Sequence, residues 1–428
     1  MATDSTDRRA EERELEAGEA EGARPERGIT RRDFILGSAA ASLLVSGTTM
    51  LIGCSSGSGD DQLNGEFEIT ELSVPESSVI QSSDFEELTT SKCISEWATY
   101  DIDMGSILHM DCDSLAIVIS PGSSNNVLTR LGFLVMSSGK VVYFLNQAIG
   151  QSEGYTIYDA RGNGEIAIWT ECNLRTGDWR VYLAAVNSSA KIMDPIKVDE
   201  GDADFDPPML CVCDKKAYWT VMPDPNGEAK ESDSYLKCAT VSMPLSQIVY
   251  TSHGRMITNP QASDGIVTIV PRADTSSTRY QMTAIDSATN QPIKGQILPK
   301  SMRVNTAIYM NDTFVFGIEQ NYNFGDGISN FGTYSATGDG KYMRFNRTPF
   351  VTPAQVGKYI VIKSTKAVVG CDMANRQFFA IDTVKGSESY GDFLVSTGTS
   401  GSIVVYTSIP KGDGSGKGKV RVRAFSVL

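Results

Sequence analysis

The chain has 428 residues, with 38 Lys and Arg against 52 Asp and Glu, which gives a formal net charge of −14. We do not expect such an acidic chain to bind nucleic acid, because neutralising phosphates requires clustered basic residues. Its length and its 41% content of hydrophobic residues allow one large domain or two ordinary ones.

The N-terminal segment differs sharply in composition from the rest of the chain. Residues 1–29 are dense in charge and contain almost nothing apolar. A segment of this kind cannot bury enough apolar surface to fold, so we predict a disordered leader over these residues.

A second segment has two adjacent arginines followed by a run of small or apolar residues that ends at Cys54. The run could just cross a bilayer, but its glycine and hydroxyl residues dilute its apolarity, as in a removable secretory signal. Around Arg31, Arg32 and Phe34, the stretch "TRRDFIL" resembles the bacterial twin-arginine export motif, although the usual final lysine is missing. The stretch "LIGC" that ends at Cys54 resembles the bacterial lipobox.

Together these resemblances imply a signal peptide over residues 30–53 that is removed, and a lipid attached to Cys54. They also imply export of the folded chain by the twin-arginine machinery, and an extracytoplasmic protein anchored to the cell membrane. Residues 54–65 contain the lipidated cysteine and a Ser/Gly-rich stretch that we expect to be a flexible tether. An uncleaved signal anchor with a chance cysteine is the alternative.

Beyond residue 65, short β-type runs alternate with turn residues. Seven continuous apolar runs recur with starts 44–51 residues apart: "AIVIS" from Ala116, "IAIWT" from Ile166, "AYWTV" from Ala217, "IVTIV" from Ile266, "FVFGI" from Phe314, "YIVIK" from Tyr359 and "IVVYT" from Ile403. A period of roughly 40–50 residues with about four strands is typical of a β-propeller blade. We therefore predict an all-β fold over residues 66–428, a single seven-bladed β-propeller; two β-sandwiches would not explain the period.

The last of the seven units has "IVVYTS" and "KVRVRAFSV" but no outer strand. The alternating stretch Glu66–Val74 precedes the first unit, so this N-terminal strand could pair with the last blade and close the ring. We expect the less regular segment from Pro75 to Tyr100 to wrap around the outer edge of the ring.

Seven cysteines follow Cys54 at irregular spacing, and an odd number does not form a complete disulfide framework. Most lie in apolar runs, so we expect free, buried thiols, with one or two disulfides formed after export as the alternative. Among the tryptophans, we expect Trp169, Trp179 and Trp219 to pack between blades, whereas Trp97 lies outside the repeat and is expected to be more exposed.

Catalytic motifs are scarce. A serine hydrolase requires a histidine base, but the chain has only His109, expected in a strand, and His253, expected in a turn, and it lacks a G-x-S-x-G elbow. Asp101 and Asp103 would point the same way on a strand. A carboxylate-based glycosidase or lyase with its site at the propeller mouth is therefore the alternative to a binding protein.

One loop has a pattern suited to a metal. Asp202, Asp204 and Asp206 occupy alternate positions between two blades, and Ca²⁺ takes several oxygens from such loops. The loop lacks the glycine and the distal glutamate of an EF-hand, so a plain acidic turn competes with a structural calcium site. We expect no other cofactor.

These observations favour a membrane-anchored extracytoplasmic propeller that binds or scaffolds a protein, a glycan or a small ligand. The chain resembles the TolB-like exported propellers in general plan only, because no blade carries a family motif. The sequence leaves enzymatic activity undecided, and a structural component of an envelope complex is a third class of function.

Overall fold

The structure is a computed structural model that describes residues 67–72, 76–122, 128–274, 278–318, 332–337, 340–345, 351–364, 367–388, 390–410 and 418–428. These residues belong to one compact unit, Ser42–Leu428. The predicted leader, the export motif with Arg31, Arg32 and Phe34, the lipidation site Cys54 and the tether lie outside the described residues.

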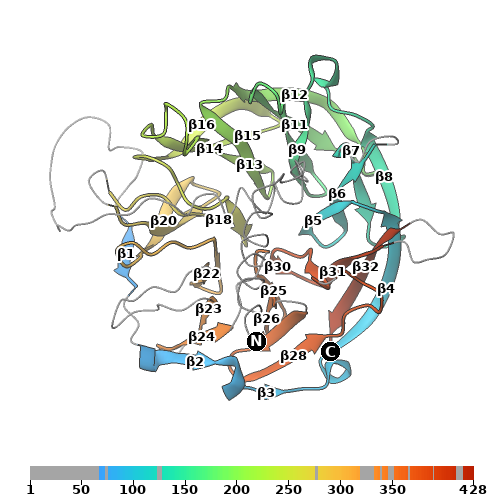
Figure 1. The fold of residues 1–428 in the computed structure, drawn as a ribbon, viewed down its shortest axis with the longest axis vertical. Coiled ribbons are helices and arrows are strands. Elements are labelled where there is room, and N and C mark those ends of the chain that lie inside the picture. Colours follow the sequence, from blue (N-terminus) through green and yellow to red (C-terminus); the bar gives the residue numbers. More distant parts are fainter. Residues whose placement is uncertain are drawn as a thin grey trace, which may run out of the picture. The chain divides into compact units, whose positions relative to one another are not determined.

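The described strands form an all-β propeller in which the sheets follow one another around a central axis (Figure 1). Six sheets are built from four consecutive antiparallel strands each. In chain order these are β5 (Ile107–Cys112), β6 (Leu115–Pro121), β7 (Leu128–Val135) and β8 (Lys140–Leu145); β9 (Thr156–Gly162), β10 (Ile166–Cys172), β11 (Trp179–Val186) and β12 (Ile192–Gly201); β13 (Phe205–Cys213), β14 (Lys216–Pro223), β15 (Ser234–Thr240) and β16 (Met243–Ser252); β17 (Gln261–Ser263), β18 (Ile266–Ile269), β19 (Gln281–Asp286) and β20 (Gln291–Ile297); β21 (Thr306–Met310), β22 (Thr313–Ile318), β23 (Gly332–Ala336) and β24 (Tyr342–Phe345); and β25 (Ala354–Val356), β26 (Tyr359–Lys363), β27 (Val368–Asp372) and β28 (Gln377–Ile381).

One further sheet, here called the composite sheet, joins strands that are far apart in the sequence. Its order is β29 (Phe393–Leu394), β31 (Ile403–Ile409), β32 (Lys419–Val427) and β4 (Ile94–Asp103). Strand β4 runs antiparallel to β32, with Ile94 opposite Val427 and Asp103 opposite Lys419. The outermost strand of this sheet therefore comes from the N-terminal part of the described chain.

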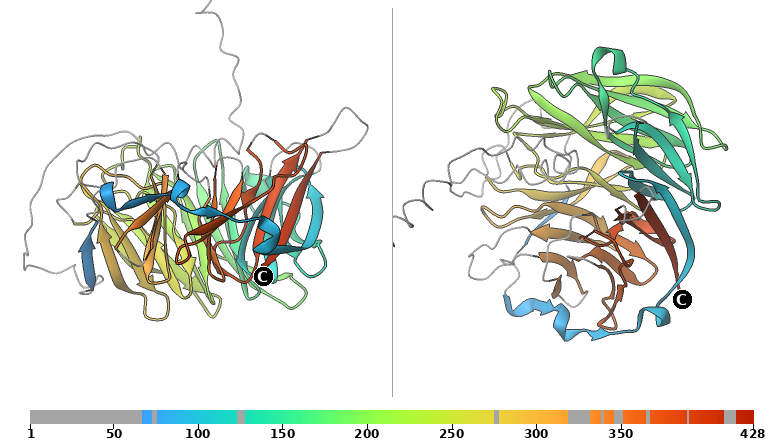
Figure 2. Two further views of the ribbon diagram at one scale, coloured as in Figure 1. Left: turned by 90° about the horizontal axis from the view of Figure 1, so that it is seen from below. Right: turned by 45° about the vertical axis from the view of Figure 1, so that its right-hand side comes forward.

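Three short strands precede β4 and add to the outer edges of other sheets. The parallel pairs are β1 (Glu68–Glu71) with β20, β2 (Val79–Gln81) with β24 and β3 (Glu86–Glu87) with β28. We call residues 67–72 and 76–103 the N-terminal belt, which runs along the outside of four sheets (Figures 1 and 2). It covers edges that would otherwise expose unpaired backbone groups, and it confirms that the segment before β4 wraps around the outer edge.

The prediction that Glu66–Val74 completes the last unit was wrong. Its described strand, β1, pairs with β20, and β4 is the strand that pairs with β32. All four residues of β1 are exposed, whereas β4 buries Ile94 and Ile102. An outer strand that packs against a neighbouring sheet buries such apolar residues, and β1 buries none.

The repeat in the sequence corresponds to one position in each sheet. Every one of the seven apolar runs is the second strand of its sheet, namely β6, β10, β14, β18, β22, β26 and β31. In the sixth unit, "YIVIK" is this second strand and "AVVGCDM" contains the third, β27. These strands are buried because other sheets lie against both of their faces, so they read as unbroken apolar runs.

The core lies between the sheets. A separate hydrophobic cluster fills each junction between successive sheets; for example, Trp169 packs between the first and second sheets, and Trp179 and Trp219 pack between the second and third. A further cluster joins the composite sheet to the first sheet through side chains such as Ile102, Leu108 and Val422. The predicted packing of these three tryptophans between blades is confirmed.

Helical structure in the described residues is limited to short 3-10 turns. They are η2 (Glu76–Ser78), η3 (Ser82–Asp84), η4 (Thr90–Lys92) and η5 (Gln151–Glu153). Within the described part of the chain, no helix has the length and apolarity needed to span a membrane.

Candidate functional site

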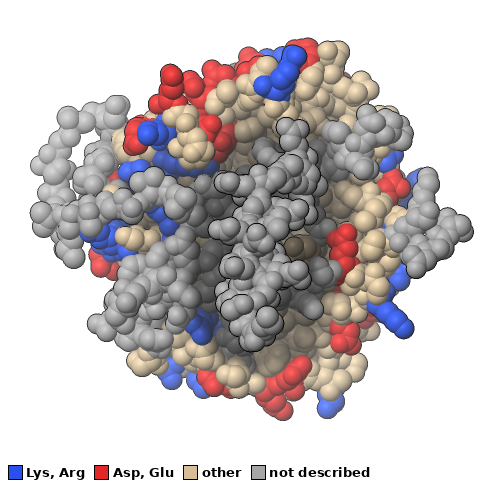
Figure 3. Space-filling model, viewed as in Figure 1, with Lys and Arg blue, Asp and Glu red and all other residues tan. Residues whose placement is uncertain are grey.

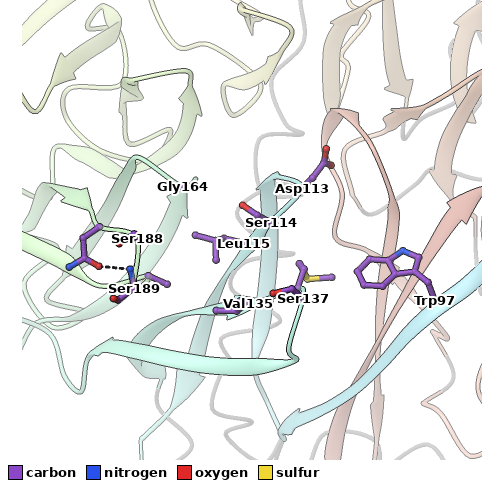
Figure 4. A pocket seen from close by; sticks show the side chains of 12 residues that line it. Trp97, Asp113, Ser114, Leu115, Val135, Ser137, Gly164, Ser188 and Ser189 are labelled. Atoms are coloured by element: carbon purple, nitrogen blue, oxygen red, sulfur yellow. Dashed lines mark hydrogen bonds between the residues drawn. The ribbon is translucent and has the colours of Figure 1, made fainter.

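A groove of about 620 Å³ lies where the composite, first and second sheets meet (Figure 4). It is formed by the β5–β6, β7–β8, β9–β10 and β11–β12 turns, which all lie at the same end of their sheets. Its polar side chains are Asp113, Ser114, Ser137, Asn187, Ser188 and Ser189. A concave site with several converging polar groups is the usual form of a ligand site.

Trp97 borders the groove and projects from β4 because of a β-bulge. Ala98 lies opposite Ala424 and Glu96 lies opposite Phe425, so two consecutive residues of β32 face three residues of β4. The extra residue is Trp97, whose side chain is 45% exposed. A bulge can redirect one side chain out of the regular alternation, and bulges are common beside binding sites.

The β7–β8 turn that lines the groove is held in place by β4. The Tyr100 hydroxyl donates a hydrogen bond to the Met136 carbonyl at 2.5 Å, and its ring lies against Gly139. Gly139 has φ +67°, and a Cβ atom there would lie 2.1 Å from a Tyr100 ring carbon. Only glycine meets both conditions without strain, so this turn is fixed relative to Trp97.

The remaining walls are ordered by local hydrogen bonds. Asn187 Oδ1 accepts bonds from the backbone N–H groups of Ser189 (2.9 Å) and Lys191 (3.2 Å), which fixes the β11–β12 turn. Asp113 Oδ1 accepts bonds from Gly401 N (2.7 Å) and Ser400 Oγ (3.1 Å). Asp113 thereby connects the first sheet to the segment before β31.

The central axis holds a second polar cluster, on the innermost strands. Asp159 pairs with Arg161 (2.6 Å) and accepts a bond from Leu210 N (3.1 Å) in the third sheet. Asp111 accepts bonds from Gly162 N and Thr397 Oγ1, each at 3.3 Å. Burial raises the pKa of the Asp111 carboxyl, and the Arg161 guanidinium partly opposes this shift.

A strand also crosses this axial region. Strand β30 (Gly398–Ser400) pairs in parallel with β25 and contacts β5, β17 and β21. Thr399 donates from its backbone N–H to Ser263 Oγ (3.1 Å) and from its Oγ1 to Asp264 (2.5 Å). The axial groups thus bond one another across several sheets, which is the role of a structural network. The groove is therefore the stronger candidate site.

No protein-family model matches the chain. No curated protein matches it either. Among solved structures, it is similar to BamB from Moraxella catarrhalis, with 10% identity, 78% of this chain and 99% of that chain covered and a TM-score of 0.37. It is also similar to the β-propeller domain of the Trilobed protease from Pyrococcus furiosus (14% identity, 60% and 80% covered, TM-score 0.39) and to Kuenenia stuttgartiensis hydrazine synthase (16%, 64% and 78%, 0.40). These likenesses concern the propeller fold alone.

The three aspartates of the predicted calcium loop are not equivalent. Asp206 pairs with Arg255 at 2.5 Å, and burial raises its pKa against the effect of that guanidinium. Asp202 Oδ1 accepts a bond from Asp204 N at 3.1 Å. Within the described residues, no group of three or more His, Cys, Asp and Glu side chains is placed to hold a metal ion. The calcium site stays a prediction, and Asp206 already has a cationic partner.

The histidines and strand-end acids lie where the sequence predicted. His109 is in β5, where burial and the nearby Arg161 hold its pKa well below its usual range. His253 follows β16, half-exposed, with Nδ1 3.4 Å from Asp233. Asp101 and Asp103 both point away from Ile102. Asp101 pairs with two basic residues, Lys419 and Arg421, and Asp103 pairs with one, Arg130. They lie on the outermost strand of the composite sheet, so they do not form a carboxylate pair at the axis.

The cysteines of the described chain are free thiols, and all except Cys112 are buried. Burial raises the pKa of Cys213 to about 11 and that of Cys371 to about 12. Cys211 and Cys213 lie in the core between the third and fourth sheets. The expectation of buried, unpaired cysteines is therefore confirmed for six of these seven positions.

Sequence reasoning missed the groove, although it identified Trp97 as a tryptophan outside the repeat. The exposure of Trp97 is confirmed. Its position depends on a bulge between β4 and β32, which lie more than 300 residues apart in the chain. A tryptophan in an otherwise alternating outer strand was the one available signal.

Proposed function

We propose that the chain is a membrane-anchored extracytoplasmic β-propeller lipoprotein that acts as a binding or scaffold module for a protein, a glycan or a small ligand. The observation that carries the binding role is the groove beside Trp97. It combines an exposed aromatic side chain, redirected by a bulge, with polar side chains on ordered turns.

The location rests on the sequence before residue 66. The twin-arginine resemblance at Arg31, Arg32 and Phe34 supports export of a folded chain, and the lipobox resemblance supports a lipid on Cys54. The export machinery and the membrane would then be partners of the chain. The Ser/Gly-rich residues after Cys54 would let the propeller move relative to its anchor.

We further propose that the sheets form a closed seven-bladed ring in which β4 completes the last blade. Two observations support closure: the antiparallel pairing of β4 with β32, and the hydrophobic cluster between the composite and first sheets. A closed ring would be stable as a folded unit before export, because its strand edges are paired or covered.

Charge supports a ligand other than nucleic acid. Basic and acidic side chains are interspersed over the face shown in Figure 3, and the whole chain is acidic. A structural calcium ion at Asp202, Asp204 and Asp206 is a secondary proposal. If it is correct, a chelator lowers the melting temperature; an unchanged melting temperature argues against a tightly bound ion.

Export and anchoring can be tested separately. Cys54→Ala should abolish lipid labelling and processing to mature size, whereas Cys112→Ala, the matched control, should leave both unchanged. Replacing Arg31 and Arg32 together by Lys should block export. Continued lipid labelling of Cys54→Ala would refute lipidation, and continued export of the double variant would indicate another route.

Binding at the groove can be tested by hydrogen exchange of the full chain in a soluble envelope extract. We expect slower exchange in the turn that contains Asn187, Ser188 and Ser189, and loss of this protection in Trp97→Ala. Exchange that the extract leaves unchanged, or slows equally in the variant, would argue against the groove. Turnover of a glycan in the same extract, measured by product formation, would favour the enzymatic alternative.

A further inference from the structure

We propose that the groove binds a neutral oligosaccharide and that Trp97 is the surface on which a sugar ring stacks. This inference rests on the proposed function, in which the groove is a binding site, and adds the chemical class of the ligand. Four observations support it: the exposed indole, the hydroxyl and amide side chains, the lack of Lys, Arg and His among the described lining residues, and the ordered turns.

The indole of Trp97 is the apolar part of the site. The side chain is 45% exposed, while the other three tryptophans of the chain are at most 2% exposed. Aromatic side chains offer a large, rigid apolar face, and covering that face releases water from it. The C–H face of a pyranose ring is flat, apolar and of similar width, so it can cover an indole while its hydroxyl groups point outward.

The polar side chains of the groove lining match those hydroxyl groups. Ser114, Ser137, Ser188 and Ser189 supply hydroxyls, and Asn187 supplies the NH₂ of its amide, because its Oδ1 already accepts two backbone hydrogen bonds. A serine hydroxyl both donates and accepts hydrogen bonds, as a sugar hydroxyl does, so either partner can take either role. The cavity of about 620 Å³ lies within the range of roughly 300–1,000 Å³ of ligand sites, which suits a short chain of sugars.

The charge of the groove lining distinguishes a neutral sugar from other ligands that stack on tryptophan. None of the described residues that line the groove is Lys, Arg or His, and the one charged side chain is Asp113. Single-stranded nucleic acids stack on aromatics in positively charged grooves, and acidic sugars would be repelled by Asp113. Proline-rich peptides dock between several aromatic side chains, whereas Trp97 is the sole aromatic residue among the described residues of this lining. A neutral sugar fits best.

The site is already shaped before a ligand arrives. Tyr100 fixes the β7–β8 turn, and Asn187 fixes the β11–β12 turn through two backbone hydrogen bonds. Ordering flexible loops costs free energy on binding, so pre-ordered turns favour weak, multi-hydroxyl ligands such as sugars. Figure 4 shows Trp97 at one side of the groove, with Ser188 and Ser189 at the other.

Trp97 also provides a selective readout, because the other tryptophans are buried. The full chain is titrated with cellohexaose, mannohexaose, laminarihexaose and chitohexaose while tryptophan emission and its quenching by acrylamide are recorded. A hexamer of galacturonic acid and a proline-rich peptide serve as the anionic and peptide probes. We expect at least one neutral hexamer to shift the emission and to protect the exposed tryptophan from acrylamide.

Isothermal titration calorimetry with that hexamer then compares variants. Trp97→Ala should weaken binding by about 30-fold or more, as expected for a central aromatic contact, and Trp97→Phe should lose less. Tyr390→Ala removes an exposed aromatic ring outside the groove lining and should bind as the unchanged chain does. Circular dichroism checks that each variant is folded.

The outcomes separate the two proposals. Protection by none of the neutral hexamers, or equal binding by Trp97→Ala, overturns the carbohydrate inference. Protection by the peptide alone also overturns it, but it leaves the groove as the binding site of the proposed function. Protection by the galacturonic acid hexamer as strong as by a neutral one refutes the argument from charge.

Discussion

The pairing of β4 with β32 predicts different effects for two isoleucines of the N-terminal belt. Ile102 in β4 is 9% exposed and packs in the cluster that joins the composite and first sheets, with Val420 directly opposite it on β32. Ile69 in β1 is 49% exposed. The same substitution at both positions therefore compares a strand packed between two sheets with an exposed strand at a sheet edge.

Ile102→Ala removes buried carbon atoms and leaves a cavity between two sheets. Such truncations cost about 2–5 kcal/mol, and the slight exposure of Ile102 places it near the lower end, at about 2–3 kcal/mol. Ile69→Ala removes a side chain that is already about half exposed to solvent, so we expect the free energy of unfolding to fall by less than about 0.5 kcal/mol. If the sheets form the closed ring proposed above, they unfold as one unit, so Ile102→Ala should lower the urea midpoint with little change in slope.

The measurement is urea unfolding of the full chain and both variants, followed by tryptophan fluorescence and by circular dichroism. Three of the four tryptophans lie in the second and third sheets, and Trp97 lies in β4 itself, so the fluorescence reports on both regions. A shared transition in both signals therefore indicates a single cooperative unit. Equal destabilisation by the two substitutions would refute the reasoning. So would a separate early transition in Ile102→Ala that leaves the main one unchanged, because β4 would then be a peripheral strand.

Other substitutions test the contacts around the groove and the loop. Gly139→Ala should lower the free energy of unfolding by about 2–3 kcal/mol, measured by thermal unfolding, because the new methyl group would clash with the Tyr100 ring and the backbone there has a positive φ. An unchanged melting temperature would contradict the close contact between Gly139 and the Tyr100 ring. Arg255→Met should lower the free energy of unfolding by about 1–3 kcal/mol at pH 7, because Asp206 loses its cationic partner. This cost should shrink as the pH falls toward the raised pKa of Asp206, since protonation removes the unpaired charge. A cost that grows in acid would refute this account. Among the described cysteines, Cys112 should react first with a maleimide at pH 7.5, because the others are buried. If mass spectrometry finds another of these cysteines labelled first, the burial of that cysteine is contradicted.

The sequence was sufficient to predict the propeller because the same pattern of burial repeats in each sheet. The second strand of every sheet is covered on both faces, so it needs an unbroken apolar run, and such runs as "IAIWT" and "YIVIK" recur at a regular spacing. The identity of the outer strand of the composite sheet was beyond this reasoning. Glu66–Val74 and Ile94–Asp103 both alternate, and only the fit of Ile102 against a neighbouring sheet decides between them.

The groove was harder still to predict. Its walls come from turns of two sheets and from Trp97 in a third, which no local pattern brings together. The register shift that exposes Trp97 exists only once β4 has paired with a strand far along the chain. Likewise, Asp206 looked like a metal ligand because its partner, Arg255, lies 49 residues away.

The belt also sets the order in which the molecule can be assembled. Its strands leave the ribosome before any of the sheets, yet β1 must wait for β20, and β4 must wait for Lys419–Val427. Contacts so distant in sequence form slowly, and until they form, the apolar residues of β4 have no partner. A nascent chain would therefore hold an unpaired edge through nearly all of its synthesis. Translocation of a growing or unfolded chain would carry that edge across the membrane, whereas the proposed twin-arginine route would begin only after translation had supplied its partner.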